Sequence, residues 1–156
     1  MGRVIKKFTV ARKGEEAEGR ACIDSAADRT IISRAVACKL DIDFETAKLA
    51  AVSGVGGRLV GYEVPVTIDV GEHGARVKAF VPAGRLTDDG EIAPARQRSL
   101  IGHDFLQKTG AKLDYSRQHS QVFSGLPEVP TPLKHERVTA AERRALRRLK
   151  PCRRRH

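Results

Sequence analysis

The chain has 156 residues, of which 40% are hydrophobic, and a formal net charge of +10. This length is typical of about one domain with a core of its own, and no apolar run approaches the roughly 20 residues that a membrane-spanning helix needs. The basic residues 1–7 are not followed by the apolar core of a signal peptide, so we expect no transmembrane segment and a cytoplasmic protein.

The positive charge is concentrated at the C-terminus. Residues 134–156 contain ten Lys or Arg and two Glu, a balance of +8, which leaves only +2 of the +10 for the rest of the chain. Pro127, Pro130 and Pro132 predict a semi-rigid linker before this segment. We therefore predict one domain at residues 1–125, followed at residues 126–156 by a Pro-containing linker and a basic helical tail.

The cysteines indicate neither a disulfide framework nor a zinc site. There are three, Cys22, Cys38 and Cys152, an odd number without Cys-x-x-Cys spacing. We expect all three to be free thiols.

The first predicted elements lead to an acidic residue. Residues 4–10 alternate as a first strand, and the polar residues 13–19 predict a hairpin loop. The apolar residues 21–23 then predict a buried strand that ends at Asp24. Because burying an ionised carboxylate without partners is costly, an aspartate there is expected to be bonded, paired or functional.

Further strands are predicted along the middle of the chain. Residues 30–32 predict a strand, and Ser33 is placed to cap a short helix that runs to Leu40. Residues 49–52 and 58–70 predict two strands joined at residues 54–57, where glycines tolerate the positive φ of a hairpin tip.

The C-terminal half continues with strands and a helix. It predicts a strand at residues 75–81, an exposed loop at 86–98, a buried strand at 99–102, a helix that stops at Gly110, and a final hairpin at 111–115 and 121–123. Thr139 and Glu142 have capping-box spacing for a helix over residues 140–150. Arginines surround most of that helix, so we expect it to be exposed or bound to a partner.

Three motifs follow one another in a fixed order. Asp24-Ser25-Ala26 comes after an apolar strand, residues 53–58 are rich in glycine, and Leu100-Ile101-Gly102 precedes a short helix. This set resembles the retropepsin-like aspartic proteases, in particular a bacterial-type single-domain member, over residues 1–125. The resemblance implies an all-β fold, a retropepsin-like acid protease barrel with one or two short helices.

The resemblance also implies roles for residues of the first motif. Asp24 would be the catalytic residue, and Ser25 and Ala26 would support the active loop and its contact across a dimer axis. Ala27 and Asp28 would bind substrate.

The glycine-rich stretch would form the flap. Val55, Gly56 and Gly57 would close over a bound peptide and exclude water. Asp28 would pair with the residue after Gly102, which is arginine in retroviral relatives and His103 here. No metal or organic cofactor is implied.

A single Asp-Ser-Ala signature predicts a homodimer. Aspartic proteolysis needs two carboxylates that share a proton around an activated water, and this chain has one such signature. The second carboxylate would come from a second copy across a two-fold axis. We therefore predict an aspartic endopeptidase that acts on an extended peptide or protein substrate.

Other interpretations remain open at this point. Asp24 could be a turn carboxylate that caps nearby amides, and Asp104 is expected to lie at a helix N-terminus rather than to be a second catalytic acid. The basic tail could be a solvated end, a non-specific nucleic-acid contact or an anionic-membrane contact. The alternative function is a non-catalytic binding or adaptor module of the same fold that contacts nucleic acid or another acidic partner through its tail.

Overall fold

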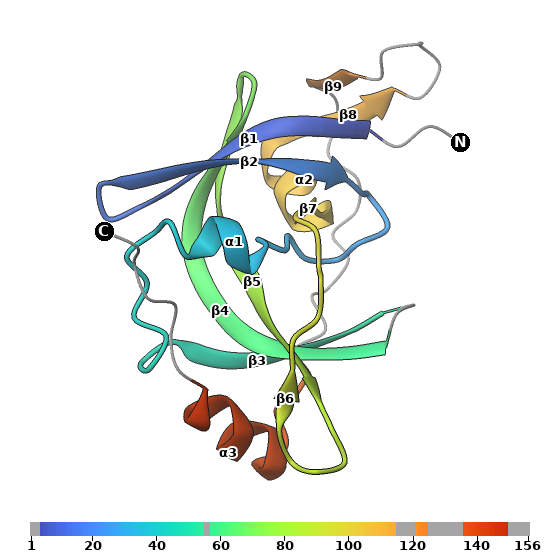
Figure 1. Ribbon diagram of the computed structural model, residues 1–156. Coiled ribbons are helices and arrows are strands. Elements are labelled where there is room, and N and C mark those ends of the chain that lie inside the picture. Colours follow the sequence, from blue (N-terminus) through green and yellow to red (C-terminus); the bar gives the residue numbers. More distant parts are fainter. Residues whose placement is uncertain (1–3, 55–56, 115–120, 125–135, 150–156) are drawn as a thin grey trace.

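The computed structural model describes residues 4–54, 57–114, 121–124 and 136–149. Strands dominate these residues, so the fold is all-β, as predicted (Figure 1). The strands are β1 (Val4–Arg12), β2 (Glu15–Ile23), β3 (Lys48–Gly54), β4 (Gly57–Val70), β5 (His73–Leu86), β6 (Ile92–Ala93), β7 (Leu100–Ile101), β8 (Ala111–Asp114) and β9 (Gln121–Ser124). The helices are α1 (Arg34–Ala37), α2 (His103–Thr109) and α3 (Ala140–Arg148).

Most of the described strands belong to one curved sheet (Figure 1). Its order is β6-β5-β4-β1-β2-β7, and β3 pairs with β4 beside this path. Ile31 forms one bridge with Phe80 of β5 and another with Leu100 of β7. This single residue therefore joins β5 to β7, where the sequence predicts a whole strand at residues 30–32. The bridge connects the two sides of an otherwise open sheet.

The β1–β2 hairpin has a tighter turn than the sequence predicts. Its strands pair from Val4 with Ile23 to Arg12 with Glu15, which leaves Lys13 and Gly14 as the turn. Both turn residues have positive φ, 49° and 81°, as a two-residue hairpin of the favoured twist requires. The predicted loop at residues 13–19 is thus mostly strand, because the polar side chains of β2 lie on its solvent-facing side.

The strands of the central hairpin are long. β4 confirms the predicted strand at 58–70 and alternates buried valines and isoleucine with exposed residues along its second half. β5 begins before and ends well after the predicted range of 75–81. The loop predicted at 86–98 contains the two-residue strand β6, which pairs with the end of β5.

The predicted helix boundaries are close to the observed ones. Ser33 caps α1 by accepting a hydrogen bond from the N–H of Val36, at 3.4 Å, but the helix ends at Ala37 rather than at Leu40. Gly110 ends α2 in the left-handed conformation, as predicted, and β8 and β9 form the predicted final hairpin. None of the helices that the structure describes is long and apolar enough to cross a membrane.

One expectation about the cysteines was wrong. Cys22 is a free thiol, half-buried in β2, whereas Cys38 is disulfide-bonded. Cys152 lies outside the described residues. No Cys-x-x-Cys or other local spacing in the sequence indicates that bond.

Helix α3 packs on the domain instead of standing exposed. It has the predicted capping box between Thr139 and Glu142, and it contacts β4, β5 and β6 (Figure 1). Leu146 is 2% exposed and belongs to the same core cluster as the barrel side chains Phe8 and Val60. The helix is therefore a layer of the fold, with its apolar side turned inward and its arginines outward.

We expect Leu146→Ala to lower the free energy of unfolding by about 2–4 kcal/mol, because it removes a fully buried side chain from a packed site. Arg143→Ala, at an exposed position of the same helix, should change it by less than about 0.5 kcal/mol. Urea denaturation followed by circular dichroism measures both. Equal midpoints for the two variants would show that the helix does not contribute to the core.

Candidate active site

Asp24 lies directly after β2 in a short loop of small residues. Its backbone N–H donates to the carbonyl of Ile101, at 2.9 Å, and its carboxylate Oδ1 accepts a hydrogen bond from the N–H of Ala26, at 3.0 Å. The N–H of Ala27 turns back to the carbonyl of Asp24, at 3.2 Å. The carboxylate is half-buried, while Ser25 and Ala26 are exposed. This turn presents one carboxylate at the surface of the domain in a fixed orientation.

The two-residue strand β7 holds both limbs of this loop. On the incoming limb, Cys22 and Ile23 pair in parallel with Leu100 and Ile101. On the outgoing limb, Ile31 and Leu100 exchange two backbone hydrogen bonds, both 2.8 Å long. Both ends of the loop at residues 24–30 are therefore hydrogen-bonded to β7, which restricts the loop more than a hairpin alone would.

The start of α2 closes the back of the loop through Gly102. A side chain at this position would meet the carbonyl of Arg29 at 2.6 Å and that of Ala27 at 2.8 Å, so only glycine fits. The next residue, His103, donates its backbone N–H to the carbonyl of Ala27, at 2.7 Å. The glycine of the third motif is thus needed for the close approach of two backbones.

Thr30 completes this contact from the fully buried interior of the loop. Its hydroxyl donates to Oδ1 of Asp104, at 2.7 Å, and accepts from the N–H of Gly102, at 3.1 Å. Asp104 also accepts from the N–H of Phe105, at 2.8 Å; it lies in the first turn of α2, but the N-cap of this helix is Gly102 rather than Asp104. Sequence reasoning placed Thr30 in a strand and missed its bonds to α2, since nothing local indicates a partner 74 residues away.

A buried ion pair joins the loop to β4. Arg29 Nη2 lies 2.7 Å from Oε1 of Glu63, and the two side chains are 5% and 6% exposed. Arg29 also donates to the carbonyl of Lys78, at 3.2 Å, and Lys48 Nζ lies 3.4 Å from Oε2 of the same glutamate. Arginine and glutamate are almost never fully buried unless paired, and no local pattern in the sequence indicated that these two residues meet.

The predicted pair between Asp28 and His103 is not formed. Asp28 is exposed, whereas His103 is 8% exposed and its Nε2 has no hydrogen-bond partner in the described part of the chain. The position that carries arginine in retroviral relatives is here packed inside the domain. Arg29 and Glu63 make the ionic contact of this loop instead.

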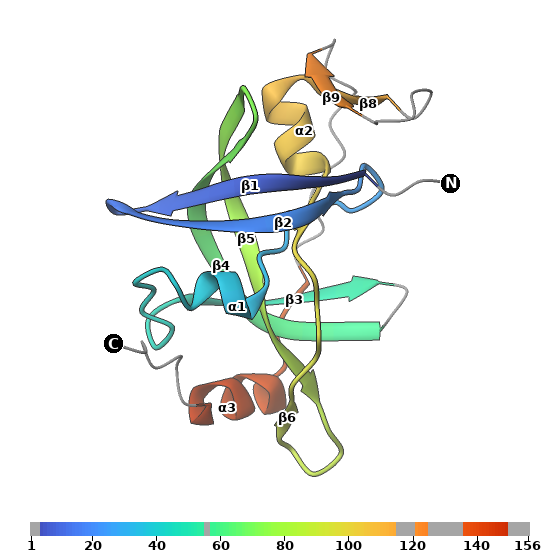
Figure 2. The same ribbon diagram turned by 45° about the horizontal axis from the view of Figure 1, so that its top comes forward.

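The predicted flap is a hairpin formed by β3 and β4. The two strands pair from Lys48 with Glu63 to Gly54 with Gly57. Val55 and Gly56, predicted to bind substrate, lie outside the described residues, and Gly57 has a φ of 102° at an exposed position. In both orientations the outer end of this hairpin lies on the same side of the molecule as the loop after β2 (Figures 1 and 2).

The family comparison agrees with this geometry. The model of a family described as aspartyl protease matches residues 8–105, which include the Asp24 loop, the β3–β4 hairpin and the start of α2. The chain belongs to this aspartyl protease family. No match to a curated protein was found.

The acidic side chains at the Asp24 loop differ in their contacts. Among the described residues, no group of three or more His, Cys, Asp or Glu side chains is placed to hold a metal ion. Two other acidic groups bonded to this loop have structural contacts, since Asp104 bonds to Thr30 and Glu63 to Arg29. Of the two remaining acidic residues of the loop, Asp28 is exposed and Asp24 is half-buried with its carboxylate bonded to the N–H of Ala26.

We expect Thr30→Val to destabilise the protein by about 1–3 kcal/mol, because it leaves the buried N–H of Gly102 without its acceptor and removes the hydroxyl donor from Asp104, which keeps only the N–H of Phe105. Thr30→Ser is the matched control: it keeps the hydroxyl and loses one methyl group, at a cost of about 1 kcal/mol. Urea denaturation gives both values. A Thr30→Val protein as stable as Thr30→Ser would contradict the assigned hydrogen bonds.

Proposed function

We propose that this member of the aspartyl protease family is an aspartic endopeptidase active as a homodimer. The observation that carries the proposal is the half-buried Asp24 carboxylate, held by the N–H of Ala26 in a loop whose incoming and outgoing chains both pair with β7. In this mechanism Asp24 and its symmetry mate share one proton. One carboxylate activates a water while the other protonates the scissile carbonyl.

The other residues of the loop support the dyad in this proposal. Ser25 and Ala26 are exposed next to Asp24 and would meet the same residues of the second protomer. Ala27 and Asp28 would face the substrate backbone. Val55, Gly56 and Gly57 would close over an extended peptide, which binds by strand-like backbone hydrogen bonds.

We expect Asp24→Asn to lower peptide cleavage by at least about 10³-fold, since the amide can neither accept nor deliver the shared proton. Its side-chain oxygen can still accept from Ala26, so the unfolding midpoint should stay the same. Cleavage of a diverse peptide library between pH 4 and 8 provides the assay. Retained cleavage in the variant would reject the mechanism.

The same variant also tests whether the active site is shared between two subunits. When wild type is mixed with an equal amount of Asp24→Asn protein at a concentration where dimers exchange, about a quarter of the dimers contain two aspartates. Cleavage per wild-type subunit should then fall to about half. Cleavage unchanged by the inactive subunits would contradict a shared active site.

One observation favours a second candidate function, contact with nucleic acid. Arg143, Arg144 and Arg147 are exposed along the outer side of α3, in a helix whose other side is fixed to the domain. Clustered arginines on a rigid helix neutralise phosphates without reading sequence. Truncation of the tail would also remove the core residue Leu146, so charge-neutralising substitutions are the better probe.

We expect the triple variant Arg143→Gln, Arg144→Gln, Arg147→Gln to reduce the salt dependence of binding to a single-stranded oligonucleotide by up to about 2 in the slope of log K against log salt. The control triple Arg20→Gln, Arg34→Gln, Lys39→Gln removes the same charge from exposed sites elsewhere. Fluorescence anisotropy at several salt concentrations measures the slopes. Equal slopes for both triples would assign any binding to net charge alone.

A further inference from the structure

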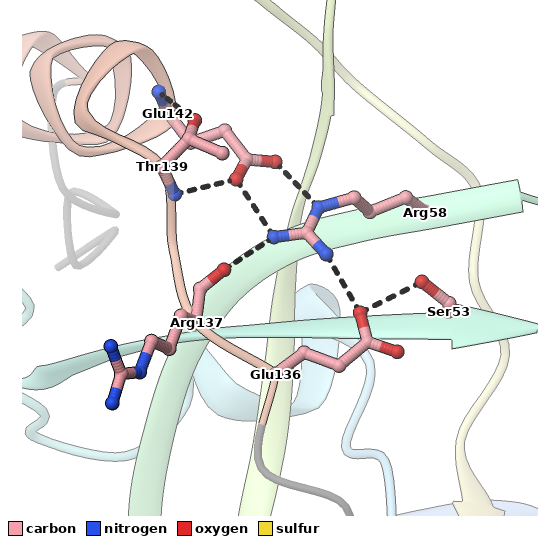
Figure 3. A network of polar contacts seen from close by, with 6 residues as sticks. All are labelled: Ser53, Arg58, Glu136, Arg137, Thr139 and Glu142. Carbon is pink, nitrogen blue, oxygen red and sulfur yellow. Dashed lines mark hydrogen bonds and ion pairs between the residues drawn. The ribbon is translucent and has the colours of Figure 1, made fainter.

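The C-terminal segment forms a cluster of hydrogen bonds and ion pairs with the β3–β4 hairpin, beside Gly57. Arg58, one residue after Gly57, donates through Nε and Nη2 to the two carboxylate oxygens of Glu142 in α3, both at 2.9 Å. Its Nη1 donates to Glu136 at 2.7 Å and its Nη2 to the carbonyl of Arg137 at 2.7 Å. Figure 3 shows the guanidinium between these groups, with Ser53 of β3 bonded to the same oxygen of Glu136 at 2.8 Å.

Glu142 is the buried and ionised member of this cluster. Glu142 is 4% exposed and also accepts from the N–H of Thr139, at 2.9 Å, as part of the capping box. The hydrogen bonds from Arg58 lower the pKa of Glu142 from 4.5 to about 2. A bidentate pair of this kind has fixed geometry as well as charge complementarity, so the carboxylate stays ionised at any pH where the protein is expected to work.

The two faces of the hairpin have different partners. Because side chains alternate along a strand, Ala51, Val60 and Arg58 share one face, where Ala51 and Val60 are buried in the same core cluster as Leu146 of α3. Ala50 and Leu59 share the opposite face, where they cluster with Phe80 and with Ile31, which directly follows the Asp24 loop. At its edge, β3 forms a bridge between Ala51 and Glu136. The hairpin is thus held between the Asp24 loop and the C-terminal helix.

We propose that Arg58 is a positioning residue, which through Glu142 and Glu136 ties α3 to the β3–β4 hairpin and sets the position of its described strands, residues 48–54 and 57–63. The proposal rests on the proposed peptidase function. The contact lies within one residue of Gly57, so the beginning of β4 cannot move from its observed place without breaking the bidentate pair or carrying α3 along. In the proposed function this hairpin borders the bound peptide, so peptide binding is the step that its position affects.

A purely structural salt bridge would have different consequences. Loss of Arg58 would then lower the free energy of unfolding of the whole protein. The rigidity of the hairpin relative to the rest of the sheet would not change. A positioning role instead predicts loosening confined to the β3–β4 hairpin and a change in the KM for peptide with little change in kcat. These two readouts separate the alternatives.

The test compares Arg58→Gln with Arg58→Lys and with Arg76→Gln, which removes an exposed arginine from β5, far along the sheet. In Arg58→Gln, hydrogen exchange of backbone amides in residues 49–54 and 58–62 should be at least about 10-fold faster, with β1 and β2 unchanged. KM should rise about 5- to 20-fold with kcat within twofold. Arg58→Lys should be intermediate, because lysine keeps the charge and loses the fork, and Arg76→Gln should match wild type.

The pH dependence supplies a further check. A carboxylate whose pKa is lowered on folding contributes stability above its unfolded pKa, near 4.5, and loses that contribution only as the pH falls toward about 2. The KM ratio of Arg58→Gln to wild type should therefore be constant from pH 8 to 5. A KM ratio that falls to 1 within this pH range would show that Arg58 acts through a group other than Glu142, and would overturn the role of Glu142.

The outcomes distinguish this proposal from the function on which it rests. If the wild type cleaves no peptide, the proposed function fails, and the exchange data still decide whether Arg58 fixes the hairpin. If Arg58→Gln speeds exchange everywhere equally, or leaves both exchange and KM unchanged, the positioning role is wrong. Faster exchange of the hairpin alone, together with a raised KM, supports it.

Discussion

The Asp24 loop depends on one short strand. β7 is only two residues long, yet Leu100 and Ile101 pair with the strand that enters the loop, and Leu100 pairs again with Ile31 where the chain leaves it. The loop is therefore fixed by backbone hydrogen bonds, which carry little dependence on side-chain identity. Two positions do depend on the side chain. Residue 102 must be glycine for α2 to approach the loop, and the hydroxyl of Thr30 must bond to the start of α2. A carboxylate at the end of a strand becomes a site only with such support.

β4 connects the Asp24 loop to the rest of the fold. It pairs with β1, β3 and β5 and carries two arginine–glutamate pairs on opposite faces. On one face Glu63 bonds to Arg29 of the Asp24 loop, and on the other face Arg58 bonds to Glu142 of α3. Breaking the buried Arg29–Glu63 pair would leave an uncompensated charge, whereas the Arg58–Glu142 pair, in which Arg58 is 36% exposed, joins β4 to α3 by its bidentate geometry.

The sequence predicted what local patterns determine. Alternation in the second half of β4, the glycine-rich turn between β3 and β4, the Ser33 cap and the capping box of Thr139 and Glu142 all depend on neighbours within a few residues. The three motifs indicated the family before any contact was known. What was missed, namely the bonds of Thr30 and the Arg29–Glu63 pair, joins residues that are 74 and 34 positions apart. Their composition is ordinary, and only the fold brings them together.

The C-terminal segment shows the same limit for charge. Summed along the sequence, residues 134–156 are a basic tail, and that sum predicts a solvated end or a polyanion contact. In the fold the charges separate by direction: the two glutamates at 136 and 142 point to Arg58, while the arginines at 143, 144 and 147 face outward. The predicted division at residue 125 stays a prediction, because residues 125–135 lie outside the described ranges. The two glutamates of the segment thus join α3 to β4, and the packing of Leu146 in the core adds to this contact.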